Sequence, residues 1–269
     1  MATKKTTTPK AAPKPQQKAK DDSILVVIPW LKAESQGKKH PELAYAVAGW
    51  QKHFKERHRI IVVGEDDPKM KGVEWIPSPR VPEKEGQYRQ HLDYVSCFRK
   101  VRKAYPDSRG FIFVADDCYA VNDFDLIDVM QIRCNGEDIF CTADDPNAWK
   151  RDKAKGKAVL VAERYPTRNY TTHLPQWYDW DKLAALWDKY DMDNESYLME
   201  DLYYNIYYRH NRPENVNNID NDRIKCGVYR SNPRLEYIER AFTEKLWITN
   251  SPEGWIPFLE DKLAEHYGL

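Results

Sequence analysis

The first half of the chain alternates short apolar runs with longer segments whose apolar residues recur at helical spacing. The runs are SILVVIPW (23–30), RIIVVGEDD (59–67), GVEWIP (72–77), FIFVADD (111–117) and DIFCTADDP (138–146). A strand that is apolar along its whole length is buried on both faces, as in a parallel sheet covered by helices. Residues 23–145 therefore predict the order β-α-β-β-α-β-α-β, an α/β fold with three layers and a mostly parallel sheet.

Two helices are predicted between these runs, at 41–54 and 87–105, from apolar residues three or four positions apart. The second half is less regular. It predicts helices at 179–191, 196–210, 233–242 and 256–268 and a strand at 245–250. Because no repeat and no second linker interrupts residues 23–269, we expect them to form one domain.

The N-terminal segment has a different composition from the rest of the chain. Residues 1–20 hold six of the 42 basic residues and no acid, so the remaining chain has 36 basic and 42 acidic residues. The body is therefore not an obvious nucleic-acid binder. Residues 1–22 are predicted to be disordered. Two interpretations stay open for them, a tether to an acidic or nucleic-acid partner and a solubilising tail.

Cysteine usage and hydropathy bear on the compartment. The five cysteines form no CxxC pair, which argues against a disulfide framework and fits a reducing compartment. No apolar run approaches the length of a transmembrane helix, and the N-terminus has no apolar signal region. The expectation is a cytoplasmic protein. P-loop and dinucleotide-binding glycine motifs are absent from the sequence.

Two adjacent carboxylates, Asp116 and Asp117, end one of the buried runs. Ligands of open α/β sheets bind beyond the carboxyl ends of the strands. Neighbouring carboxylates repel each other and are costly to desolvate unless a cation compensates them. Oxygen ligands suit Mg²⁺ or Mn²⁺, which bridge to substrate phosphates. A metal site with a phosphorylated substrate is one interpretation, and a solvated turn is the other.

This order of elements resembles the GT-A glycosyltransferase fold, in which a DxD motif after a central strand binds Mn²⁺ or Mg²⁺ and a nucleotide sugar. The matching triplet is Ala115-Asp116-Asp117, so the first acid of the motif is missing. The resemblance implies that Asp117 is a metal ligand and that Asp116 is a metal ligand or a ribose contact. It also implies a nucleotide-binding half at 23–146 and an acceptor-binding half at 147–269.

A second stretch, Met199 to Leu202, resembles the xED motif of many GT-A enzymes. In inverting members the Asp of that motif deprotonates the acceptor hydroxyl. The resemblance therefore implies that Asp201 is the base and that Glu200 orients the acceptor. The alternative is that both acids simply occupy the first turn of a helix, where the helix dipole favours them.

A third stretch, NYTTHLPQWYDWDKL at 169–183, resembles Stealth-type sugar-phosphate transferases of capsule synthesis. By that resemblance His173 faces the phosphates or acts as acid or base. The chain departs from the Stealth pattern in two places. Their Asn-Asp-Asp signature is Ala-Asp-Asp here, and their N-terminal Trp-Val-Asp-Gly block is absent. A structural histidine is the alternative for His173.

Four further residues are implied as nucleotide contacts because of where they lie in the predicted fold. Arg80, Arg89 and His91 precede the acidic strand, in a region that often binds the nucleotide or diphosphate in GT-A folds, and arginine matches phosphate geometry. Trp30 ends the first strand, where it is placed to stack on the base. Exposed helix charges and a core tryptophan are the alternatives.

The leading expectation is a metal-dependent, inverting glycosyltransferase that uses a nucleotide-diphosphate sugar and a hydroxyl acceptor. That acceptor is a glycan, a lipid-linked group, a protein or modified DNA. One alternative is sugar-1-phosphate transfer of the Stealth type. The other is a degenerate GT-A-like domain used for binding or assembly and tethered by its basic tail, an alternative that Ala115 keeps open.

Overall fold

A computed structural model describes residues 22–31, 42–216 and 224–269, so the predicted tail lies outside the described residues apart from Asp22. Its central sheet has the strand order β3-β2-β1-β4-β7. Four strands are parallel, and β7 pairs antiparallel to β4. The strands are β1 (Ile24–Trp30), β2 (His58–Gly64), β3 (Val73–Pro77), β4 (Gly110–Phe113) and β7 (Gln176–Asp179). The prediction of an α/β fold with a mostly parallel sheet is confirmed.

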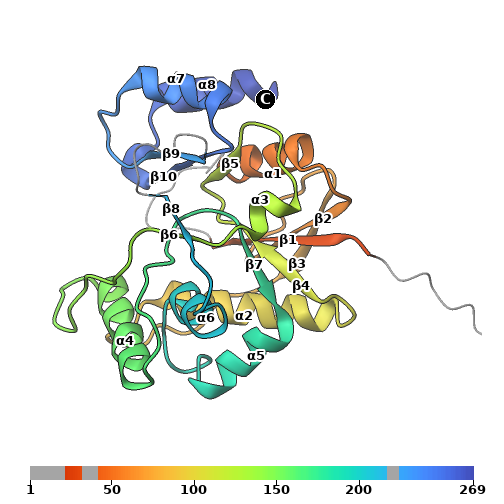
Figure 1. Cartoon of the computed structure of the whole chain (residues 1–269). Coiled ribbons are helices and arrows are strands. Elements are labelled where there is room, and N and C mark those ends of the chain that lie inside the picture. Colours follow the sequence, from red (N-terminus) through yellow and green to blue (C-terminus); the bar gives the residue numbers. More distant parts are fainter. Residues whose placement is uncertain (1–21, 32–41, 217–223) are drawn as a thin grey trace, which may run out of the picture.

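Helices cover both faces of this sheet (Figure 1). Alternate residues of β1 point to opposite faces, so Val26 and Ile28 pack towards α1 while Leu25 and Val27 pack towards α2. The helices of the chain are α1 (Glu42–His53), α2 (Arg89–Ala104), α3 (Leu126–Met130), α4 (Ala148–Ala162), α5 (Trp180–Lys189), α6 (Met199–Tyr207), α7 (Leu235–Glu244) and α8 (Pro257–Tyr267). Within the described ranges, no helix is both long and apolar enough to cross a membrane.

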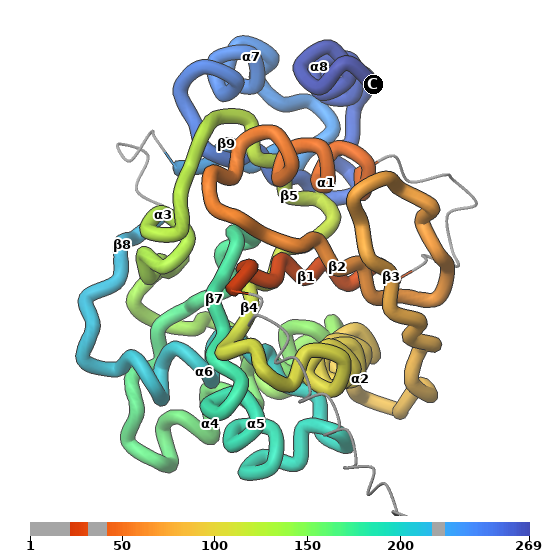
Figure 2. Tube along the Cα trace, turned by 90° about the vertical axis from the view of Figure 1, so that its right-hand side faces the viewer, coloured from red at the N-terminus to blue at the C-terminus, as the bar shows by residue number. Residues whose placement is uncertain are grey.

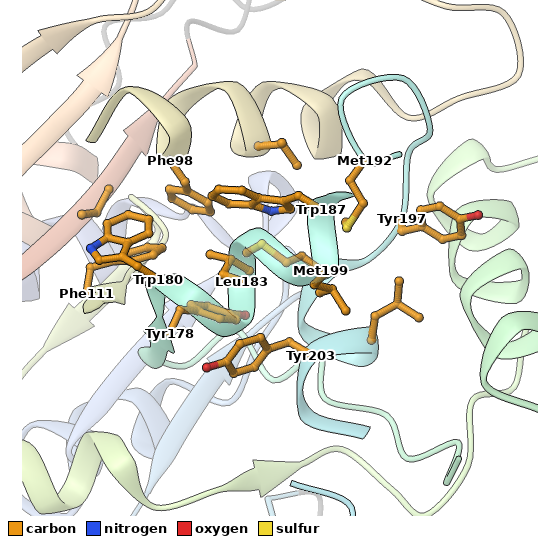
Figure 3. Close-up of a cluster of buried hydrophobic side chains, with 14 of the residues drawn as sticks. Phe98, Phe111, Tyr178, Trp180, Leu183, Trp187, Met192, Tyr197, Met199 and Tyr203 are labelled. Atoms are coloured by element: carbon orange, nitrogen blue, oxygen red, sulfur yellow. The ribbon is translucent and has the colours of Figure 1, made fainter. Parts of the chain in front are cut away.

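The larger core lies between the sheet and helices α2, α5 and α6, and it is rich in aromatic rings (Figure 3). Phe111 of β4 stacks on Trp180, with ring centroids 4.2 Å apart. Phe98 of α2 packs against the same phenylalanine at 4.7 Å. Aromatic contacts of this kind add to the stabilisation that burial alone provides. They fix the start of α5 beneath the amino-terminal end of β4, where Gly110 pairs with Asp179.

A second, three-stranded sheet lies on the far side of α1 (Figures 1 and 2). Its order is β5 (Cys118–Ala120), β10 (Trp247–Asn250) and β9 (Lys225–Val228). Helices α7 and α8 pack on this sheet through a small core of their own. Because β5 begins only a few residues after β4 ends, the acidic pair links the two sheets.

The strand predicted at 138–146 is wrong. Only two-residue β6 (Arg133–Cys134), paired with β8 (Glu214–Asn215), forms in this region. The free edge of β4 that such a strand needs is already taken by β7. Ile139 is buried as predicted, but Phe140 is 87% exposed. The segment is instead anchored by Asp138, whose carboxylate accepts hydrogen bonds from Lys157 and Thr167.

Candidate active site

The acidic pair lies in a tight turn where the chain passes from the central sheet to the small sheet. The backbone N–H of Val114 still donates to Val27 of β1 at 3.0 Å, and the N–H of Cys118 closes the turn on the carbonyl of Ala115 at 3.2 Å. Asp116 and Asp117 are the two central residues of that turn, a position that suits aspartate. The turn therefore presents both carboxylates at the carboxyl end of the sheet.

The surroundings of Asp117 disfavour the charged form of its carboxyl group. Burial raises the pKa of its carboxyl group well above the ordinary value, and the charges of Asp116 and Glu42 raise it further. Among the described residues, no hydrogen-bond donor reaches its buried Oδ1 atom. A buried carboxylate oxygen without a partner is costly, so this atom is suited to an added cation or donor.

Asn250 of β10 supports the turn from the small sheet. Its N–H donates to the carbonyl of Asp117 at 3.3 Å. Its side-chain amide donates to Glu42 at 2.9 Å, and its carbonyl accepts from the hydroxyl of Tyr119 at 2.6 Å. Glu42 and Asn250, which lie far apart in the sequence, thus support the acidic turn together with the neighbouring Tyr119.

Two adjoining cavities meet at the acidic pair. The larger has a volume of about 600 Å³ and the other about 380 Å³. Asp116, Asp117, Tyr88, Gln90 and Pro252 line both of them. This arrangement offers room for two ligand groups that meet at the carboxylates.

The larger cavity gathers three of the residues predicted as nucleotide contacts, which are Trp30, Arg80 and Arg89. Nε of Arg80 donates to buried Asp93 at 2.8 Å, and Nε of Arg89 donates to the carbonyl of Val81 at 2.7 Å. These bonds fix the orientation of both guanidinium groups while their outer nitrogens make no hydrogen bond within the described chain.

His91 lines the smaller cavity and is tied to α4. Its Nδ1 lies 2.9 Å from Oδ2 of Asp152, which also accepts from the N–H of Tyr88 at 3.2 Å. A carboxylate at Nδ1 keeps the proton on that nitrogen and leaves the Nε2 lone pair available in the neutral ring.

His173 and Glu200 line the same cavity from the second half of the chain. His173 adopts a left-handed backbone conformation (φ 54°), which turns its ring towards Tyr229 at 6.0 Å between centroids. Desolvation of the ring within the cavity and the nearby charges of Lys225 and Lys153 lower the pKa of His173, which favours the neutral ring. Glu200 lies in the first turn of α6.

Asp201 does not line either cavity, in contrast to its neighbour Glu200. Its side chain is buried, with Oδ1 accepting from the N–H of Tyr170 at 2.6 Å and Oδ2 lying 3.4 Å from Nζ of Lys153. Successive helical residues point about 100° apart, so two adjacent acids cannot share one direction. The structure thus brings together all the predicted site residues except Asp201.

Sequence reasoning missed several residues of the site. Tyr94, Trp149, Tyr229, Asn250 and Gln176 also line the smaller cavity. Aromatic residues at such positions are indistinguishable in the sequence from core residues. Gln176 and Asn250 lie in strands whose pairing is long-range, and Tyr229 directly follows such a strand. The high aromatic content was the one signal that pointed to Tyr94, Trp149 and Tyr229, and no signal pointed to the other two.

No protein-family model and no curated protein matches this chain. Among solved structures, the chain is similar to one described as a glycosyltransferase involved in the glycosylation of the major capsid of PBCV-1. That match has a TM-score of 0.43 and 12% identity and covers 92% of this chain and 100% of the other.

Proposed function

We propose that the protein is a glycosyltransferase that moves a sugar from a nucleotide-diphosphate donor to a hydroxyl acceptor. The observation that carries this proposal is the acidic turn, because Asp116 and Asp117 line both of the two adjoining cavities. A reaction between two substrates that releases a charged leaving group needs two binding cavities that meet at the leaving group. The sequence motifs described above support the same assignment.

The donor nucleotide is assigned to the larger cavity. Trp30 offers a ring for the base at the end of β1, and Arg80 and Arg89 offer oriented guanidinium groups for the diphosphate. Planar guanidinium groups are well matched to phosphate oxygens. The transferred sugar then lies at the acidic turn and the acceptor in the smaller cavity.

A divalent cation, Mn²⁺ or Mg²⁺, is part of this proposal. Across the described residues, no group of three or more His, Cys, Asp or Glu side chains forms a ready metal site. Such ions are commonly held by one or two carboxylates together with substrate phosphates and water. Asp117, with its unpartnered Oδ1, and Asp116 fit that partial ligand set. When bound, the ion would neutralise charge on the leaving diphosphate.

Glu200 is the better-placed proton acceptor, because it lines the acceptor cavity and Asp201 does not. In the proposed step the acceptor oxygen forms a bond to the anomeric carbon. The bond from that carbon to the diphosphate oxygen breaks, and the acceptor's proton passes to the carboxylate of Glu200. Attack opposite the leaving group gives inversion. His173, neutral beside Tyr229, is available to hydrogen-bond the acceptor.

The test measures nucleotide release from UDP-, GDP-, CDP- and TDP-sugars with Mn²⁺ or with EDTA. Glu200→Gln is expected to lower turnover at least 100-fold with little change in donor binding. Glu236→Gln is the matched control, because Glu236 is an exposed acid in the first turn of α7. Full turnover by Glu200→Gln would contradict the assignment of Glu200 as the base.

Product analysis separates the enzymatic alternatives. A glycosidic product with a nucleoside diphosphate supports sugar transfer, whereas a phosphodiester with a nucleoside monophosphate supports sugar-1-phosphate transfer. A folded protein that neither binds nor turns over any of the four donors would favour the binding or assembly alternative.

A further inference from the structure

A buried ion pair lies directly behind the candidate active site. Nζ of Lys153 on α4 is 3.4 Å from Oδ2 of Asp201 on α6, with side chains only 3% and 1% exposed. Opposite charges this deeply buried are costly to desolvate, and they persist when further hydrogen bonds satisfy them. The partners of these two side chains therefore indicate what the pair holds in place.

The further hydrogen bonds of the two side chains go to one segment, residues 168–173. Lys153 donates to the side chains of Asn169 and Thr171, and Asp201 accepts from the N–H of Tyr170. Asn205, one turn after Asp201 on the same face of α6, binds both the N–H and the carbonyl of Arg168. Thr171, Thr172 and His173, at the end of this segment, line the smaller cavity.

The two helices joined by the pair also carry cavity residues. Trp149 lies one turn before Lys153 on α4, and the ammonium group lies 4.9 Å from the centre of its ring. Glu200 immediately precedes Asp201 on α6. A shift of either buried charge would therefore move a wall of the cavity.

We propose that Lys153 and Asp201 act as one positioning pair, which holds Trp149, the His173 segment and Glu200 in a common arrangement. This proposal rests on the glycosyltransferase function for its kinetic consequences but not for its structural ones. Asp201, the acid that the motif implies as the base, is thereby a positioning residue that does not touch the substrate.

The experiment uses Asp201→Asn, Lys153→Met and the double variant of the full chain. Hydrogen–deuterium exchange of the peptide spanning 168–174 needs no donor. Each single variant leaves one buried charge unpaired and is expected to speed exchange there roughly tenfold or more, whereas the double variant recovers most of the protection. Arg102→Met and Asp181→Asn, which break an exposed ion pair, are the matched controls and should leave exchange unchanged. Unchanged exchange in both single variants would overturn the positioning role.

The kinetic arm compares the pH dependence of nucleotide release from the same four donors. Asp201→Asn is expected to retain the acidic limb of the wild-type profile at a lower rate, and the double variant should regain activity. Glu200→Gln should lose that limb. Asp201→Asn with wild-type exchange but activity as low as Glu200→Gln would show that Asp201 acts on the substrate. If the wild type releases no nucleotide, the proposed function fails while the exchange result still decides the positioning role.

Discussion

The ring of His91 and the carboxylate of Asp152 meet 2.9 Å apart on the wall of the candidate active site, joining α2 to α4. Both side chains are buried, and Asp152 also accepts the backbone N–H of Tyr88 at the start of α2. One carboxylate therefore fixes both the tautomer of a cavity histidine and the end of the helix that carries it.

Asp152→Asn is expected to destabilise the protein by about 1 to 3 kcal/mol, because a buried charge-assisted hydrogen bond is lost and one donor is left poorly satisfied. Urea denaturation measures this change. The control is Asp181→Asn, whose side chain is 94% exposed and whose effect should stay within about 0.5 kcal/mol. Equal stability of the two variants would show that the His91 contact contributes nothing.

Asp117→Asn is expected to abolish stabilisation by Mn²⁺. A cation at 100 times its dissociation constant stabilises the folded state by about 2.7 kcal/mol, and the variant should lose this gain. In EDTA at neutral pH the variant should be at least as stable as the wild type, because the raised pKa of Asp117 means that its charge is unfavourable in the fold. Thermal shift measures both effects, with exposed Asp144→Asn as the control. Retained Mn²⁺ stabilisation would contradict the ligand assignment.

His266→Gln is expected to weaken the pH dependence of stability. Burial lowers the pKa of His266 to about 4, and Lys52 and His53 contribute to this shift. The unfolded chain then binds the proton more tightly than the folded one, so stability is lost as pH falls from about 6.5 to about 4. Because the ring is partly exposed and screened, the effect should be only about 1 kcal/mol.

Urea midpoints at pH 7 and pH 4.5 test this expectation. The wild type should lose more stability between the two than His266→Gln, and exposed His210→Gln should behave as the wild type. A loss that is the same in all three proteins would assign the pH dependence to other groups.

Phe111→Ala is expected to cost about 3 to 5 kcal/mol, the usual range for removing a buried phenylalanine. Its ring is fully buried and stacked on Trp180. Phe140→Ala provides the same chemical change at a side chain that is 87% exposed, and its cost should stay within about 0.5 kcal/mol. Urea denaturation compares the two, and similar costs would contradict the assigned core.

Strands β1, β2 and β4 of the central sheet were predictable because their residues are buried against helices on both faces, whereas β7 was not predicted. Leu25 to Ile28 are all apolar and all buried, two on each side of β1. The run at 138–146 looked the same in the sequence but found no open edge on the sheet. Strand pairing is a property of the whole fold, so a local pattern cannot reveal that the edge is taken.

The acidic turn was predictable for a similar local reason, since a charged pair that directly follows a buried strand must lie at the end of the sheet. The directions in which the side chains of Glu200 and Asp201 point were not predictable from the sequence. Asp152 and Lys153 were hidden for another reason. They lie within KRDK at 150–153, a run that is typical of a solvated helix, and only the folded chain supplies His91 and Asp201, the partners beside which they are buried.

The support that Asn250 gives to Asp117 also has a consequence for biosynthesis. The four parallel strands of the central sheet lie within residues 24–113 and can pair while the ribosome is still translating the second half. The acidic turn cannot be completed then, because β10 enters the small sheet between β5 and β9 only after residue 250 has emerged. A nascent chain would therefore form its central sheet before the acidic turn is complete. A stop codon before β10 would leave the sheet with Asp116 and Asp117 but without the support of Asn250.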